Sequence, residues 1–119
     1  MNVLLVMPGE RPKEIEIDAS LESMQNIVGG LIQAIYPFDD PVALICNAEG
    51  KLIGLEPNRA LRDTETGAIY DIIFGPFLIC GLGNNDFDSL PSNLMEMYQN
   101  MFATPELFIK VGSKIIVLP

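Results

Sequence analysis

A short polar run, Glu56-Pro57-Asn58-Arg59, lies between apolar segments and carries the side chains best suited to hold a ligand. Pro57 fixes the local backbone, Asn58 offers hydrogen-bond donors and acceptors, and Arg59 presents a planar fork that matches a carboxylate or phosphate. Polar turns between apolar strands often form a binding surface. The same residues also have a structural interpretation, in which Asn58 caps a turn and Arg59 pairs with a nearby carboxylate.

The dipeptide Tyr70-Asp71 is the second candidate, because a carboxylate there enters an otherwise apolar segment. A buried carboxylate needs a partner, since an uncompensated buried charge is costly. Asp71 could hold the hydroxyl or amine of a ligand, or it could form an internal ion pair with Arg59. The candidate binding residues are therefore Asn58, Arg59, Tyr70 and Asp71.

The sequence lacks the residue patterns of common catalytic and metal sites. It has no histidine, which removes the usual general base and the usual metal ligand. The run Gly81-Leu82-Gly83-Asn84 lacks the lysine and the hydroxyl residue of a phosphate loop, and Asp86 and Asp88 are too few for an EF-hand. We expect no enzymatic activity, no cofactor and no metal. A carboxylate pair assembled in space, such as Asp39-Asp40 with Asp71, stays open.

The two cysteines, Cys46 and Cys80, lie inside apolar runs and are expected to be small buried residues with free thiols. The longest apolar runs are far shorter than the roughly 20 residues that span a bilayer. The first residues have no basic segment of the kind that opens a signal peptide. These features predict a cytoplasmic protein that does not enter a membrane.

The charge is strongly acidic, with 16 acidic and 7 basic residues and a net charge of −9. Direct binding to nucleic acid is therefore not expected, because it requires clustered lysine and arginine. No basic residue occurs from residue 71 to residue 109, a stretch that contains five acidic ones. This stretch could dock on a basic partner, or it could be an ordinary solvated surface.

Periodicity and turn residues predict the elements that position these side chains. Alternating or continuous apolar runs bounded by glycine and proline indicate strands at 3–7, 14–18, 31–36, 42–46, 51–53, 69–74, 77–82, 107–111 and 114–118. Ser20 can cap a helix that ends at Gly29-Gly30. Asp88 or Ser89 can cap a second helix that has Pro91 in its first turn.

Together these elements predict one α+β domain over residues 1–119. Its largely antiparallel or mixed sheet has about seven to eight strands, with two helices packed on one face. The last strand, 114–118, is expected to complete this sheet, and the alternative is that its edge pairs with a second subunit. The expected state is a monomer or a weak homodimer.

Several motifs between residue 25 and about residue 82 resemble a family of small domains of unknown function, found in bacteria, especially Gram-positive ones, and in their phages and conjugative elements. The motifs are Ile27-Val28-Gly29-Gly30, Cys46-Asn47-Ala48-Glu49-Gly50-Lys51-Leu52, Gly54-Leu55-Glu56-Pro57-Asn58-Arg59-Ala60-Leu61 and Tyr70-Asp71-Ile72-Ile73-Phe74-Gly75, with Pro8-Gly9 before them. Glu56 departs from the proline or small residue that the pattern has there. The resemblance implies an accessory protein of mobile elements that acts by binding, and it supplies no catalytic residues.

The leading hypothesis from the sequence is a non-enzymatic accessory protein that binds another protein. It rests on the acidic charge, the missing catalytic patterns and the resemblance. The alternative is a domain that binds a small ligand, a metabolite or a nucleotide, at a site centred on Asn58, Arg59 and Asp71.

Overall fold

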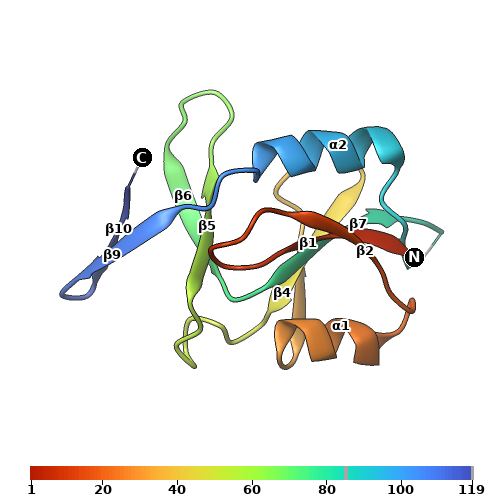
Figure 1. Cartoon of the computed structure of the whole chain (residues 1–119), viewed down its shortest axis with the longest axis horizontal. Helices are drawn as coiled ribbons and strands as arrows, with labels where there is room; N and C mark the ends of the chain where they lie inside the picture. The colour runs from red at the N-terminus through yellow and green to blue at the C-terminus, as the bar shows by residue number, and fades with distance from the viewer. Residues whose placement is uncertain (85, 119) are drawn as a thin grey trace.

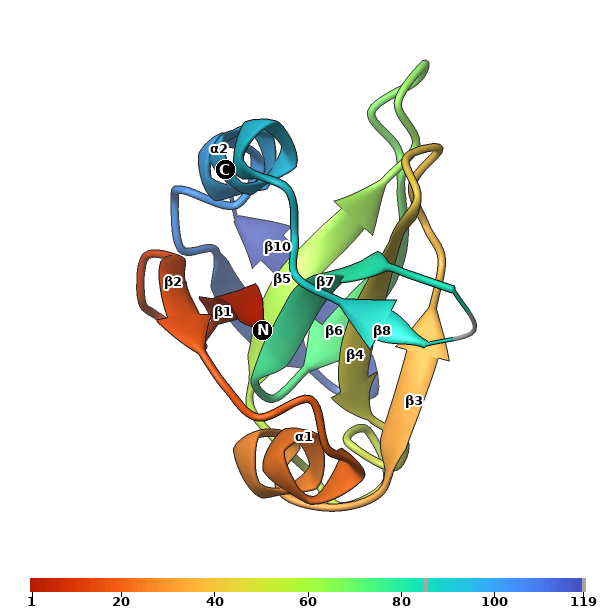
Figure 2. The same ribbon diagram turned by 90° about the vertical axis from the view of Figure 1, so that its right-hand side faces the viewer.

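An antiparallel sheet of six strands forms the centre of the computed structural model, which describes residues 1–84 and 86–118. Five strands follow one another in the order β2-β1-β7-β4-β3, and β8 pairs with the end of β7 (Figure 2). The strands are β1 (Asn2–Val6), β2 (Lys13–Glu16), β3 (Ile32–Ile35), β4 (Val42–Asn47), β7 (Phe77–Leu82) and β8 (Phe87–Asp88). The interior strands β1, β7 and β4 are nearly continuous apolar runs, as expected for strands covered on both faces.

Side chains of these interior strands alternate between two cores, one on each face of the sheet. In β4, for example, Val42, Leu44 and Cys46 belong to one core, and Ala43 and Ile45 belong to the other. Each core therefore needs its own cover. The sequence prediction that both helices lie on one face is wrong, because these strands have no polar face to leave uncovered.

The two helices cover opposite faces, with the sheet between them (Figure 1). Helix α1 (Leu21–Val28) adds Met24 to one core, and α2 (Ser92–Met101) adds Met95 and Tyr98 to the other. The predicted limits of α1 are confirmed: Ser20 accepts a hydrogen bond from the Ser23 backbone, and Gly29 takes the left-handed conformation at φ 81°.

The predicted cap of α2 is wrong, since its N-cap position is Pro91 and no side chain caps it. The side chains of both proposed caps are used elsewhere. Asp88 Oδ1 accepts from the Ser89 backbone, and Ser89 Oγ accepts from the backbone N–H of Asn2. Ser89 therefore ties the segment before α2 to the start of β1.

A second, two-stranded sheet consists of β5 (Pro57–Arg62) and β6 (Ile69–Phe74). The bounds of β6 and β7 agree with those predicted. By contrast, β5 was expected to be a polar connection, and residues 51–53 were expected to be a strand. Residues 48–54 are instead turns, closed by hydrogen bonds from Ile53 N to Glu49 O and from Leu55 N to Gly50 O.

The last two strands, β9 (Leu107–Val111) and β10 (Lys114–Leu118), form a hairpin with the predicted bounds. The prediction that the last strand completes the main sheet is wrong. Within the described residues β10 pairs only with β9, in a separate two-stranded sheet that projects away from the main one (Figure 1).

The predicted α+β class, with largely antiparallel strands and two helices, is confirmed. The structure divides the ten strands of its described part among three sheets. Neither helix is long and apolar enough to cross a membrane in the part of the chain described.

Candidate functional site

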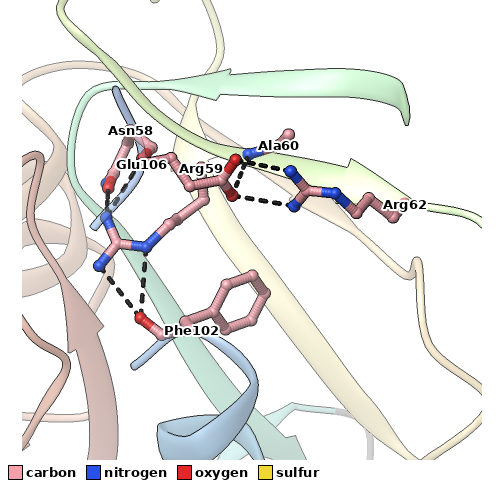
Figure 3. Close-up of polar contacts among 6 residues, drawn as sticks. All are labelled: Asn58, Arg59, Ala60, Arg62, Phe102 and Glu106. Carbon is pink, nitrogen blue, oxygen red and sulfur yellow. Dashed lines mark hydrogen bonds and ion pairs between the residues drawn. The ribbon is translucent and has the colours of Figure 1, made fainter. Parts of the chain in front are cut away.

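Arg59 lies in the interior of the protein, although the sequence made it the leading candidate for binding a ligand. Its side chain is fully buried and makes five hydrogen bonds, all of them to uncharged oxygen atoms. Nε and Nη2 donate to the Phe102 carbonyl, and Nη1 donates to the carbonyl and the side-chain oxygen of Asn58 (Figure 3). Nη2 also donates to the Glu10 carbonyl. These bonds use the five N–H groups of a guanidinium.

Asn58 is equally buried, and its amide completes the same network. Nδ2 donates to the Val6 carbonyl at 2.8 Å and to the Gly75 carbonyl at 2.9 Å, while Oδ1 accepts from Arg59. The two side chains thus link β5 to the end of β1, to the turn after β6 and to the end of α2. We assign Asn58 and Arg59 a structural role, because they are closed to solvent and their donors already have partners.

Burial lowers the pKa of Arg59, and the nearby charge of Glu106 opposes this shift. Neutral carbonyl groups satisfy the donors of Arg59 but do not neutralise its charge. The buried guanidinium of Arg59 is therefore stabilised by hydrogen bonds from all of its N–H groups. In the part of the chain described, no buried side-chain nitrogen or oxygen lacks a hydrogen-bond partner.

The expected Arg59–Asp71 ion pair is wrong. In the register of the two strands Arg59 lies opposite Ile73, and Asp71 lies opposite Leu61. Asp71 Oδ1 instead accepts from Lys51 Nζ at 2.6 Å, in a partly exposed ion pair. The turns at 48–54 bring Lys51 to this side of β6, so a partner nearer to Asp71 takes the place of Arg59.

Glu106 is a second polar anchor that the sequence did not single out. Its carboxylate accepts two hydrogen bonds from Arg62, at 3.1 and 2.9 Å, and one from the Ala60 backbone at 3.1 Å (Figure 3). The bond with Glu106 raises the pKa of Arg62. Since Glu106 immediately precedes β9, this contact fixes the base of the C-terminal hairpin against β5. The only sequence signal was an isolated acid between α2 and the hairpin.

Tyr70 lies in a surface groove of about 310 Å³ beside the β5–β6 pair. The groove is largely apolar and is lined by side chains from three separate segments, among them Phe38, Leu61, Tyr70, Met101 and Phe102. The Tyr70 side chain is exposed, and it can contact a bound molecule. Asp63 stands at the rim, and hydrogen bonds from the backbones of Thr66 and Glu65 lower its pKa and keep it charged.

Asp71 faces a different, more polar cleft of about 460 Å³, whose lining includes Lys51, Gln33 and Cys46. Neighbouring residues on a strand point to opposite faces, so Tyr70 and Asp71 belong to separate surfaces. The structure therefore divides the four candidate residues into an internal pair, Asn58 and Arg59, and two unconnected surface positions.

The remaining ionisable groups in the interior are two thiols and a phenol. Burial raises the pKa of Cys46 and raises that of Cys80 to about 12. Burial also raises the pKa of Tyr98, whose hydroxyl donates to Asp40 at 2.8 Å. Both thiols are free and buried, as predicted. Residues 1–84 and 86–118 contain no cluster of three histidine, cysteine, aspartate or glutamate residues able to hold a metal ion.

We expect stability to fall at alkaline pH, and Cys80 to account for part of the loss. A thiol whose pKa is raised in the folded state stabilises that state fully below the unfolded pKa, 9.0, and progressively less until about 12. At about pH 10.5 the loss from Cys80 is on the order of 2 kcal/mol. Urea unfolding of the wild type and of Cys80→Ala at pH 7 and about pH 10.5 measures it. Equal alkaline losses in both proteins would contradict this assignment.

The model of DUF3846, a domain of unknown function, matches residues 1–103. The matched region contains the main sheet, both helices and the β5–β6 pair, and it extends beyond the resemblance found at 25–82. No curated protein and no solved structure is significantly similar to this chain. Because the family model covers residues 1–103 of the 119, the chain belongs to the DUF3846 family.

Proposed function

We propose that this chain is a non-enzymatic binding protein, an accessory of a phage or another mobile genetic element, and that a segment of its partner protein binds in the groove at Tyr70. The observation that carries the proposal is an open apolar groove floored by Leu61 and Phe102 and bordered by an exposed tyrosine. Tyrosine in a desolvated pocket is a common hot spot of protein interfaces. The origin in mobile elements rests on the sequence resemblance alone.

Charge defines the chemistry of the partner. Asp63 lines the groove, Glu65 follows on the same turn, and the exposed Asp39 directly follows Phe38. The nearest cation, Arg62, is already paired with Glu106. The groove therefore suits a protein segment that inserts one large apolar side chain and carries lysine or arginine beside it.

Replacing Tyr70 with alanine is expected to weaken binding of such a segment by at least tenfold, as the loss of a hot-spot aromatic does. The partner segments come from selection against a random displayed peptide library, followed by affinity measurement on the individual peptides. Tyr36→Ala is the matched control: Tyr36 and Tyr70 are exposed to 60% and 58%, and Tyr36 does not line the groove. Selected peptides without a basic-apolar pattern, or equal effects of the two substitutions, would refute the proposal.

The small-ligand hypothesis keeps one specific observation in its favour. The polar cleft beside Lys51 and Asp71 is large enough, at about 460 Å³, for a small metabolite. It cannot be centred on Asn58 and Arg59, because both are buried with their donors engaged. It therefore stays a prediction for the Lys51–Asp71 surface only.

A further inference from the structure

The outward face of the C-terminal hairpin is almost entirely aliphatic. Residues paired across an antiparallel ladder lie on the same face of a sheet. The pairs Leu107–Leu118, Ile109–Ile116 and Val111–Lys114 thus share one face. The exposed fractions are 66% for Leu107, 45% for Ile109, 54% for Val111 and 47% for Ile116. Only Lys114, at the tip, interrupts this apolar surface.

The opposite face of the hairpin is turned toward the body of the protein. It carries Phe108 and Ile115, which are half-buried and line a cleft together with Leu55, Pro57 and Phe74. On the outward face Leu107 also borders this cleft, but Leu107, Ile109, Val111 and Ile116 all stay exposed. A two-stranded hairpin is marginally stable by itself, and soluble monomers rarely expose continuous apolar patches. The arrangement therefore points to a partner that packs on the outward face.

Charge indicates which partner fits. The hairpin, residues 107–118, contains two of the seven basic residues and none of the sixteen acidic ones. The chain carries −9 in total, so the remainder carries −11. Both hairpin lysines, Lys110 and Lys114, lie close to the tip. A second copy of this chain offers both an aliphatic face of the same shape and an acidic body for the basic tip.

We propose that two copies of this chain form a symmetric dimer by packing the outward faces of their hairpins against each other in opposite directions. A two-fold axis then passes near Ile109 and Ile116, and the tip of each hairpin covers the base of the other. The two sheets lie about 10 Å apart, as in a β-sandwich. Val111 then lies over Leu107 of the second copy, and the methylene chain of Lys114 lies over its Leu118, with the ammonium group directed toward the acidic body of that copy.

The hydrogen bonds of Glu106 to Ala60 and Arg62 join the base of the hairpin to β5. The hairpin lies outside residues 1–103, the part that matches the family. It is also separate from the groove at Tyr70. The two proposals can therefore be tested separately. Tyr70→Ala is expected to weaken partner binding and to leave the dimer intact.

Sedimentation over a concentration series tests the dimer in the full chain. The wild type is expected to sediment as a dimer, and Ile109→Glu as a monomer. Leu52→Glu is the matched control, since it places the same charge on another exposed aliphatic residue outside the hairpin, and it is expected to remain dimeric. A monomeric wild type, or a dimer that Ile109→Glu does not weaken, would overturn the proposal.

Disulfide trapping tests the geometry and does not depend on the folding of the charged variant. Ile109→Cys, close to the two-fold axis, is expected to cross-link with its own copy under mild oxidation. Val111→Cys alone is expected not to cross-link, because two residues of displacement on each copy separate the thiols by about 14 Å along the strands. A mixture of Val111→Cys and Leu107→Cys is expected to give the mixed dimer. Cross-linking of Val111→Cys with itself would indicate edge pairing instead and would exclude this arrangement.

Discussion

Replacing Arg59 with methionine is expected to lower the free energy of unfolding by about 3 kcal/mol. Two effects oppose each other. Methionine removes the cost of burying a charge, which favours the variant. It also deprives the buried carbonyl oxygens of Asn58 and Phe102, the buried side-chain oxygen of Asn58 and the partly buried carbonyl oxygen of Glu10 of their donors. An unsatisfied buried acceptor costs about 1–3 kcal/mol. Several such losses outweigh the gain.

Urea unfolding followed by circular dichroism measures the difference, and Arg11→Met is the matched control. Arg11 is exposed, so the same substitution there is expected to cost less than about 0.5 kcal/mol. Arg59→Lys is expected to lie closer to Arg59→Met than to the wild type, because an ammonium group cannot reproduce the planar fork. If Arg59→Met is no more destabilised than Arg11→Met, the network does not hold these segments together.

The sequence predicts those elements well whose determinants are local. Strands β6, β7, β9 and β10 are runs rich in β-branched and aromatic residues bounded by glycine or other turn residues, and their limits were predicted correctly. Helix α1 was predicted because Ser20 and Gly29 act within their own turn. For these elements the residues that decide the structure are neighbours in the chain.

Strand β5 was not predictable in the same way. Its Asn58 and Arg59 look exposed by composition, yet both are buried. Their partners are backbone carbonyls of Val6, Gly75 and Phe102, and backbone carbonyls leave no trace in the residue types of a sequence. The polar pattern therefore predicted a binding site at residues whose side chains instead join internal segments through hydrogen bonds.

The candidate site was predicted in part for the same reason. Tyr70 was selected from the sequence and lines an open groove, but part of the lining, such as Phe38 and Met101, comes from residues far away in the chain. Only the packing of β5, β6 and α2 brings these together. The pairing of Asp71 with Lys51 likewise depends on the turns at 48–54, where the sequence pattern predicts a strand at 51–53.

Replacing Gly81 with alanine is the second large effect that we expect, a loss of about 3 kcal/mol in the free energy of unfolding. A Cβ atom at this position would lie 2.3 Å from the Ser89 carbonyl oxygen, a backbone atom that no side-chain rotation can move away. The Ser89 segment cannot retreat cheaply, because it is bonded to Asn2 both through Ser89 Oγ and through the backbone N–H of Leu90. The glycine that could have suggested a phosphate loop is thus required by the crossing of β7 and the segment that leads to α2.

Gly67→Ala separates this close contact from the ordinary cost of losing a glycine. Gly67 has a φ of 74° and no neighbouring atom within 4 Å of an added Cβ, so its replacement strains only the backbone. That strain costs about 1 kcal/mol. Urea unfolding of both variants compares the two costs directly. If Gly81→Ala costs no more than Gly67→Ala, the Ser89 segment is free to shift. The junction between β7 and α2 is then softer than its hydrogen bonds to Asn2 indicate.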